Sequence, residues 1–323
     1  MKKWASNILR FLLPLLISAV VLIYTYRDYD FSKVWYDIGR LNLWWILLAL
    51  IFSWLSPLFR GLRWAQLISS SGYRVSNSVS SLIVFTGYAA NIIVPRFGEI
   101  SRCAILDRYN GVPFSKGLGT LLAERFVDMV LLILISLITI IWQMPMFLRL
   151  FTIGANSSVD EAPAGDSMSA LWVVIIVVAL SLVVWLVKKF RLMDRIRVFL
   201  RDLWMGFKAV IAVRQRGRFI TYSVAIWICY YLEMYVAFFS LESTSGVGAI
   251  AGLVCFVAGS FAVLVPTPNG AGPWHWVVIN MLLLYGVPES DAQPLALVLH
   301  TAQTFAYLIA GVVAWVMLHF VKN

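Results

Sequence analysis

The sequence predicts an all-α polytopic membrane protein, and three observations lead to this fold class. Hydrophobic residues make up 61% of the 323 residues and the mean hydropathy is +0.84. Only 13% of the residues are charged, about half the share that is usual in soluble domains. Several apolar runs reach the length of roughly 20 residues that a helix needs to cross a bilayer. These features exclude a soluble enzyme, a disordered protein and a transmembrane β-barrel, whose strands alternate in polarity.

Six apolar runs are predicted to form complete membrane-spanning helices. They are residues 8–26, 43–59, 119–142, 170–187, 219–241 and 294–320. The first is interpreted as a retained helix because no small-residue cleavage pattern follows it. Two other apolar stretches end in segments rich in proline and glycine, at 95–99 and 266–273, where a continuous helix must break.

The charges between the apolar runs predict the orientation. Residues 188–218 hold ten Lys and Arg against two Asp, a net charge of +8 out of +10 for the chain. This segment is therefore predicted to be a basic amphipathic helix on the cytoplasmic surface, and the charge is not taken as a sign of nucleic-acid binding. The acidic segment 143–169 is predicted to be an external loop. Both termini, and a loop at 60–76 that contains three arginines, are then expected in the cytoplasm of a bacterial-type plasma membrane.

This orientation requires residues 77–118 to begin and end on one side of the membrane, and residues 248–293 to do so on the other. The simplest solution is a re-entrant hairpin in each segment, although charge alone also allows two full crossings. The tripeptide Gly-Val-Pro occurs at 111–113 and again at 286–288, which indicates an internal repeat. In this alignment Asp128 matches Gln303.

The predicted organisation is a single membrane domain, 1–323, of two inverted halves, 1–142 and 170–323. Each half has two helices, a broken re-entrant hairpin and a further helix. Inverted repeats with discontinuous helices are typical of transporters.

The first break contains charges that suit a phosphate group. Arg96 and Arg102 offer bidentate donors, and Glu99 is expected to hold an arginine or to exchange a proton. Three further residues shape the break: Asn91, Pro95 and Gly98. The alternative is an ordinary interfacial loop whose arginines touch lipid headgroups.

The helix after the first break carries Glu124, Arg125 and Asp128 near the middle of the membrane, where charges are costly. Arg125 is expected to meet a lipid phosphate, and Glu124 or Asp128 to neutralise it when the site is empty. Asp128 is three residues from Arg125, which allows the two to pair on one helix. The alternative is a buried ion pair that only stabilises helix packing.

The second break offers backbone N–H groups and one ionisable side chain. Its candidate residues are Pro266, Asn269, Gly270, Gly272 and His275. A lone histidine in such a place is more often structural than functional. Glu233 and His300 lie in apolar helices and are weaker candidates. No nucleotide-binding loop, nucleophile triad or zinc motif occurs, so no cofactor, metal or catalytic residue is predicted, and the chain is not expected to be an enzyme.

Three stretches resemble one known family, the transmembrane region of lysylphosphatidylglycerol synthase, also called flippase-like. They are GYAANIIVPRFGEISRC at 87–103, LAERFVD at 122–128 and PTPNGAG at 266–272. The resemblance implies lipid translocation, with substrates that range from aminoacylated phospholipids to polyprenyl-linked carriers. His275 stands where the family usually has an acidic residue. The family's soluble aminoacyl transferase domain is not in this sequence, so aminoacylation is not expected.

Three hypotheses for the function follow. The first is a lipid transporter or flippase for an anionic phospholipid or a polyprenyl-phosphate-linked lipid. The second is a membrane-embedded transferase that acts on a lipid phosphate, with Glu124, Asp128 or His275 as the base. The third is an accessory subunit that docks a cytoplasmic partner through residues 188–218.

Overall fold

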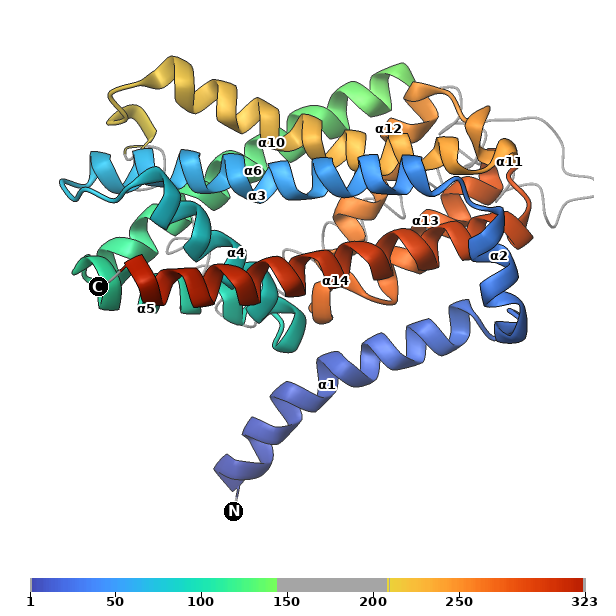
Figure 1. The fold of residues 1–323 in the computed structure, drawn as a ribbon, viewed down its shortest axis with the longest axis horizontal. Helices are drawn as coiled ribbons and strands as arrows, with labels where there is room; N and C mark the ends of the chain where they lie inside the picture. The colour runs from blue at the N-terminus through green and yellow to red at the C-terminus, as the bar shows by residue number, and fades with distance from the viewer. Residues whose placement is uncertain (1, 144–207, 209, 322–323) are drawn as a thin grey trace, which may run out of the picture.

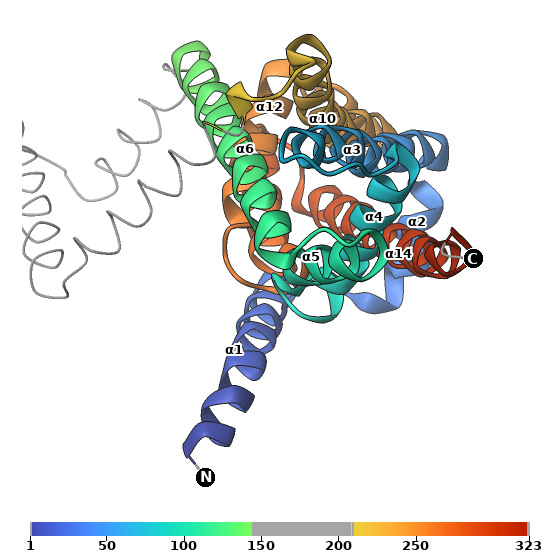
Figure 2. The same cartoon turned by 90° about the vertical axis from the view of Figure 1, so that its left-hand side faces the viewer.

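The computed structural model describes residues 2–143, 208 and 210–321, and every regular element in these ranges is helical (Figure 1). The four long helices are α3 (Leu43–Ser70), α6 (Phe114–Trp142), α10 (Arg216–Ala237) and α14 (Glu289–Val321). α3, α10 and α14 run roughly along the long axis of the molecule, and α6 crosses it obliquely (Figures 1 and 2). Each is long and apolar enough to cross a membrane, α10 together with the short turn that follows it. The prediction of an all-helical, multi-pass membrane protein is confirmed.

The first helix, α1 (Lys2–Thr25), contains the first predicted run but diverges from the bundle (Figures 1 and 2). It packs on the bundle through α13 and the second break, where the Ser18 hydroxyl donates to the Ala271 carbonyl at 2.9 Å. A 3₁₀ turn, η1 (Phe31–Lys33), and the short helix α2 (Val34–Arg40) connect α1 to α3. Arg40 forms a 2.8 Å ion pair with Asp291, which ties α2 to the start of α14.

Short helices lie between the long ones. α4 (Asn77–Ile93) and α5 (Phe97–Asn110) pack on each other between α3 and α6. The second set follows α10: η2 (Phe238–Ser240), α11 (Glu242–Ser245), α12 (Ala249–Ala262), η3 (Pro268–Gly270) and α13 (Pro273–Leu284). Both predicted breaks are therefore present, because helical backbone stops at Val94–Arg96 and again between α12 and α13.

One predicted helix end is wrong. The run at 43–59 was expected to stop before a loop at 60–76, but α3 continues through Pro57 to Ser70. Arg60 and Arg63 are buried inside this helix, at 4% and 0% exposure. The prediction placed both arginines in a loop because it considered only the charges in that segment. The carboxylates that neutralise them lie on another helix, α6. The loop itself is only 71–76, and it holds Arg74.

The predicted external loop 143–169 lies outside the described residues except for Gln143. The predicted helix 170–187 does so completely. The basic segment 188–218 is described only at 208 and from 210 onward, and its last residues begin α10.

The Gly-Val-Pro tripeptide has the same structural place in both of its occurrences. Gly111 and Gly286 both follow a short helix and adopt positive φ angles, 63° and 81°. The two valines are buried, and each proline directly precedes the first residue of a long helix, α6 or α14. Glycine adopts positive φ angles without steric cost, which explains why glycine occupies the first position of the tripeptide at both turns.

Small residues let the helices approach closely. A Cβ atom on Gly311 of α14 would overlap the Cβ atom of Ala89 and lie 2.8 Å from the carbonyl oxygen of Phe85. α14 packs along α4 at this contact. A Cβ on Gly98 would similarly overlap the carbonyl oxygen of Gly87, which joins α5 to α4. Membrane helices commonly use such small residues where backbones come close.

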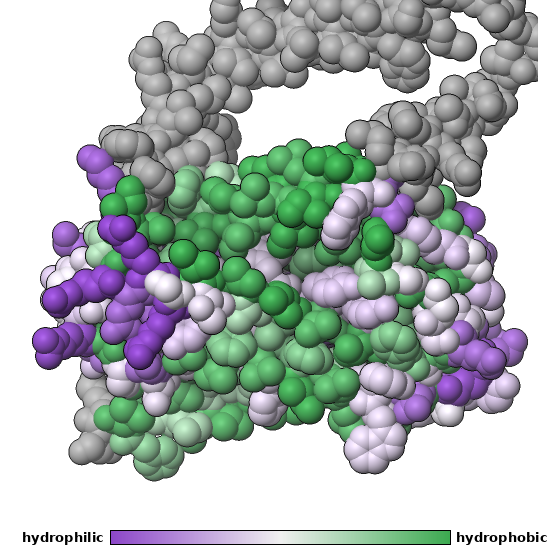
Figure 3. Space-filling model, turned by 90° about the horizontal axis from the view of Figure 1, so that it is seen from above, coloured by the Kyte–Doolittle hydropathy of each residue, from purple (hydrophilic) through white to green (hydrophobic). Residues whose placement is uncertain are grey.

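The surface has a hydrophobic belt between two polar ends (Figure 3). One end is basic. It comprises the loop 71–76, the C-terminus of α5 and the N-termini of α6 and α10. Its charged residues are Arg74, Asp107, Arg108, Lys116, Lys208, Arg214, Arg216 and Arg218. The other end is richer in acids. Its charged residues are Arg27, Asp28, Asp30, Lys33, Asp37, Arg40, Glu242, Glu289 and Asp291.

The contact at Gly311 makes a prediction about stability. We expect Gly311→Val to lower the free energy of unfolding by about 1–3 kcal/mol, because the added side chain overpacks the α4–α14 interface. Gly119→Val is the matched control, since a Cβ there meets no atom within 4 Å in the described part of the chain. Thermal unfolding of the purified protein in detergent measures both. Equal melting temperatures for the two variants would contradict this account of the interface.

Candidate functional site

Five charged side chains from three helices form one buried cluster, which we call the arginine cluster. α3 supplies Arg60 and Arg63, α5 supplies Arg102, and α6 supplies Glu124 and Asp128. All five are between 0% and 8% exposed. Three arginines and two carboxylates give the cluster a net charge of +1.

Each carboxylate binds more than one arginine. Asp128 accepts from Arg60 and from Arg63, both at 2.7 Å. Glu124 accepts from Arg102 at 2.8 Å and also pairs with Arg60. The spacing explains the geometry, because residues three or four apart lie on one face of a helix. The two arginines of α3 therefore face the two carboxylates of α6, and the short α5 brings Arg102 alongside.

The cluster lies deep in the bundle. Glu124 is about ten residues into α6, roughly 15 Å from the basic end, and Asp128 is one turn deeper. Charges at this depth are tolerated only when they are paired or face a polar cavity. Losing one partner of a buried pair leaves an uncompensated charge, which is far more costly than losing a surface pair.

The arginines retain unused donors. The Nε atoms of Arg60, Arg63 and Arg102 are buried and make no hydrogen bond to any described residue. The guanidinium group of Arg102 lies over the Trp64 ring, with Cζ 4.3 Å from its centroid. A net positive charge with three unused N–H groups is an arrangement that an anion with several acceptor oxygens would complete.

Hydroxyl groups surround the cluster. Tyr230 of α10 accepts from Arg60 at 3.2 Å and lies 2.5 Å from the Tyr88 hydroxyl of α4. Ser223, also on α10, accepts from Arg63 at 3.3 Å. Through these bonds the cluster contacts both α4 and α10.

Arg125 is not part of the cluster, and the expected partner was wrong. It was expected to pair with Glu124 or Asp128, but it forms a 2.9 Å ion pair with Glu99 of α5. Both side chains are partly open, at 44% and 33% exposure. The physical reason is that Glu124 and Asp128 turn toward α3, where stronger partners surround them. Of the charged residues predicted for the site, Arg125 and Glu99 thus form a second, accessible pair beside the buried cluster.

The first break is closed by a side-chain cap. Asn91 of α4 accepts from the Gly98 N–H of α5 at 2.7 Å, which holds the two helices together across Pro95. Arg96 at the break is exposed and adopts a left-handed conformation, with φ at 64°. It donates to the Leu264 carbonyl at 3.4 Å, so the two breaks lie next to each other.

The second break is held by two histidines. His300 of α14 donates through Nε2 to the Asn269 carbonyl at 3.0 Å, and Asn269 donates to Thr304 at 2.9 Å. His275 is buried and accepts from the Gly272 N–H at 3.3 Å, at the start of α13. The two imidazole rings are 4.4 Å apart. Gly270 and Gly272 have positive φ angles, 75° and 93°, and Pro266 precedes them at the start of the break.

Several residues of the site were not predicted. Arg60 and Arg63 were assigned to a loop, and neither Tyr88 nor Tyr230 was considered. The signal that was available is the continuation of the apolar pattern beyond Pro57, which places Arg60 and Arg63 one turn apart on one helix face. The tyrosines carried no such signal, because their role depends on a contact between α4 and α10.

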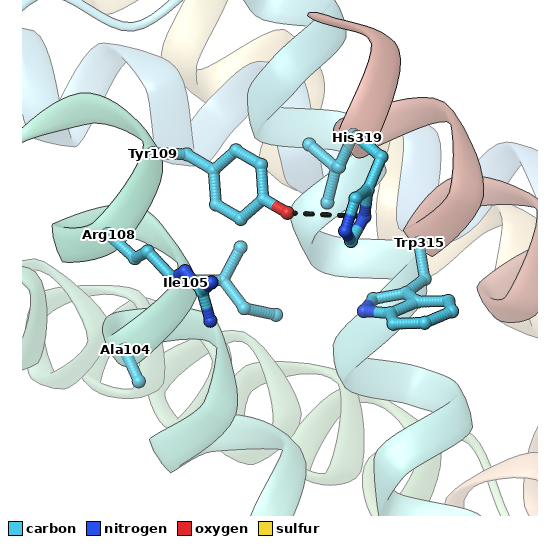
Figure 4. A pocket seen from close by; sticks show the side chains of 7 residues that line it. Ala104, Ile105, Arg108, Tyr109, Trp315 and His319 are labelled. Carbon is cyan, nitrogen blue, oxygen red and sulfur yellow. Dashed lines mark hydrogen bonds between the residues drawn. The ribbon is translucent and has the colours of Figure 1, made fainter. Parts of the chain in front are cut away.

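A separate cavity of about 350 Å³ opens at the basic end (Figure 4). It lies between α5 and α14 and is lined by Ala104, Ile105, Arg108, Tyr109, Trp315, Leu318 and His319. The Tyr109 hydroxyl and the His319 Nδ1 atom are 3.4 Å apart across it. None of the predicted site residues lines this cavity. Within the described ranges, no three His, Cys, Asp or Glu side chains are grouped to hold a metal ion.

The geometry of the two ion-pair sites makes a prediction about stability. We expect Asp128→Asn to lower the free energy of unfolding by about 3–5 kcal/mol, because three buried arginines then share the single carboxylate of Glu124. Glu99→Gln is the matched control and should cost at most about 1 kcal/mol, since its pair is partly exposed. Thermal unfolding in detergent compares the two variants. An equal loss in both would contradict the buried cluster described here.

Comparison with known proteins places these motifs in a family. The family model described as the lysylphosphatidylglycerol synthase TM region matches residues 11–311. The chain is also 24% identical over 230 residues to a UPF0104 membrane protein of Methanocaldococcus jannaschii, which covers 69% of this chain and 91% of that protein. The family match spans both breaks, the arginine cluster, α3, α6 and α10, and the first two thirds of α14. The chain belongs to the lysylphosphatidylglycerol synthase transmembrane-region family.

Proposed function

We propose that this protein moves an anionic, phosphate-bearing lipid between the two leaflets of the plasma membrane. The observation that carries the proposal is the arginine cluster, with a buried net charge of +1 and three unused guanidinium N–H groups. A phosphodiester carries one negative charge and several acceptor oxygens, so it matches the cluster in both respects. Membership of a family named for a lipid-modifying synthase supports a lipid as the ligand.

The accessible pair Arg125–Glu99 is the proposed point of access. Its partial exposure lets a headgroup reach Arg125 from the side of the bundle, with phosphate replacing Glu99 as its partner. Arg96 lies at the first break, next to this pair, and its exposed side chain adds a third accessible charge to Arg125 and Glu99. From there Arg102, on the same helix as Glu99, leads to the buried arginines.

The two halves of the chain are proposed to be inverted repeats with re-entrant hairpins. Support comes from the repeated Gly-Val-Pro turn and from the lengths of α5, α12 and α13, which are too short to cross a bilayer alone. Further support comes from matching positions: Arg60 and Glu233 each lie about 17 residues into their long helix, α3 or α10. Asp128 and Gln303 likewise lie about 14 residues into α6 and α14.

The basic end is proposed to face the cytoplasm. The excess of Lys and Arg there follows the positive-inside rule, and the C-terminus of α14 lies at this end (Figure 1). A cytoplasmic N-terminus is part of the same proposal.

Labelling of single cysteines tests this topology. We expect Ser76→Cys and Ser115→Cys to react with a membrane-impermeant maleimide from the cytoplasmic side, and Ser290→Cys from the opposite side. Cys103, Cys229 and Cys255 are buried, so their background reaction should be small. Phe97→Cys, at the first break, should react slowly from either side. Fast reaction of Phe97→Cys from the side that labels Ser290→Cys would mean that α4 and α5 cross the membrane fully.

Lipid movement in reconstituted vesicles tests the function. We expect wild-type protein to accelerate the transfer of headgroup-labelled phosphatidylglycerol, and Arg125→Ala to reduce the rate about 10- to 100-fold. This range corresponds to the loss of one charged hydrogen-bonding partner. Arg74→Ala is the matched control, because Arg74 is exposed in the loop 71–76 and far from both sites. Equal rates in the two variants, or no transfer of any anionic lipid, would refute the proposal.

Lipid mass spectrometry of a deletion strain separates this function from the alternative of a lipid-phosphate transferase. A transporter leaves the inventory of lipids unchanged and alters their distribution between leaflets, whereas a transferase removes one lipid species from the inventory.

A further inference from the structure

A buried carboxyl group without a cation lies near the arginine cluster. Glu233 of α10 is 5% exposed, and its bonded partner is the Gln303 amide of α14. No Lys, Arg or His nitrogen of the described residues lies within 4 Å of it, in contrast to Glu124 and Asp128. The function proposed above does not involve this carboxyl group.

The side chains that face Glu233 are polar but carry no formal charge. α3 contributes Ser53, α14 contributes Gln303 and Tyr307, and Cys229 lies one turn back on α10. α12 and η2, which also pack on α10, contain no charged residue. The Ser53 hydroxyl is buried and has no hydrogen-bond partner with favourable distance and angles among the described residues. Because a hydroxyl can donate or accept, Ser53 can serve Glu233 in both of its protonation states.

Polar side chains connect Glu233 to the cluster. Gln303 lies 3.5 Å from the Tyr307 hydroxyl, and the Tyr307 ring packs on Tyr88 with centroids 4.9 Å apart. Tyr88 bonds Tyr230, which in turn bonds Arg60. Ser53 and Arg60 are about seven residues apart on α3, so Glu233 lies roughly 10 Å along the axis from the cluster. At this separation in a low-dielectric interior the two charges interact appreciably.

The charges balance in a way that depends on the ligand. With the site empty, an ionised Glu233 offsets the net +1 of the arginine cluster. A bound phosphodiester also offsets that charge, which leaves the negative charge of Glu233 without compensation. Uptake of one proton by the Glu233 carboxylate restores neutrality, and release of the ligand returns the proton.

We propose that Glu233 is a proton-binding site, and that one proton binds there for each phosphate-bearing lipid that occupies the arginine cluster. This inference rests on the function proposed above, because it needs phosphate at the cluster. It adds the coupling ion, which makes the loaded state electroneutral and allows a proton gradient to drive translocation.

Calorimetry tests the coupling directly. Short-chain phosphatidylglycerol is titrated into the detergent-solubilised full chain at alkaline pH, where the Glu233 carboxyl of the empty protein is ionised, in two buffers that differ in their enthalpy of ionisation. We expect the wild type to take up about one proton for each lipid bound, and Glu233→Gln to bind the lipid with proton uptake close to zero. Glu233→Asp, which keeps a carboxyl group, should retain measurable uptake. Glu242→Gln is the matched control, because Glu242 is exposed at the acidic end, and it should behave like the wild type.

Each result decides between the two proposals. Lipid binding without proton uptake in the wild type, or equal uptake in wild type and Glu233→Gln, overturns the coupling and leaves the transport function in place. Absence of lipid binding in the wild type overturns both. If Glu233→Gln proves unstable, Glu233→Asp decides: proton uptake that is retained but shifted to a different pH from that of Glu242→Gln supports the same site, and uptake identical to that of Glu242→Gln at every pH counts against it.

Discussion

The mutual neutralisation of the arginine cluster is the interaction on which the rest of this structure depends. Three guanidinium groups and two carboxylates are buried in a bundle whose outer surface carries an apolar belt between two polar ends. None of these charges is stable at that depth without its partners. The cluster therefore determines how α3, α5 and α6 must be arranged. It also explains why α3 continues past Pro57 with two arginines on its buried face.

Close backbone contacts allow this arrangement to form. α5 approaches α4 through Gly98 and Gly87, and the Asn91 side chain caps the resulting break. This is how a short helix carries Arg102 inward to Glu124. The second break is held differently, by hydrogen bonds from α14 to the backbone through His300 and Asn269. The first break thus holds charges, and the second holds neutral hydrogen-bonding groups.

This difference extends to the long helices. The pair Arg60 and Asp128 has its counterpart, by position, in Glu233 and Gln303. One pair is ionic and belongs to a cluster with net positive charge, while the other contains a single carboxyl group and an amide. Tyr230 accepts a hydrogen bond from Arg60, and Tyr88 bonds the Tyr230 hydroxyl. The two regions therefore differ in charge: the first is a positively charged cluster, and the second is a single buried carboxyl group among neutral polar side chains.

The sequence by itself determined the fold class, the existence of the four long helices, both breaks and the charged candidates near the first break. These follow from local properties, because the length of an apolar run and the presence of proline or glycine act within a single segment. Which charges meet was decided only by the tertiary structure. Glu124 and Asp128 pair with Arg60, Arg63 and Arg102, which are 22 to 68 positions away in the chain, while Arg125 turns to Glu99. Pairing over such separations depends on helix packing and on the requirement that every buried charge find a partner, and neither can be inferred from one segment alone.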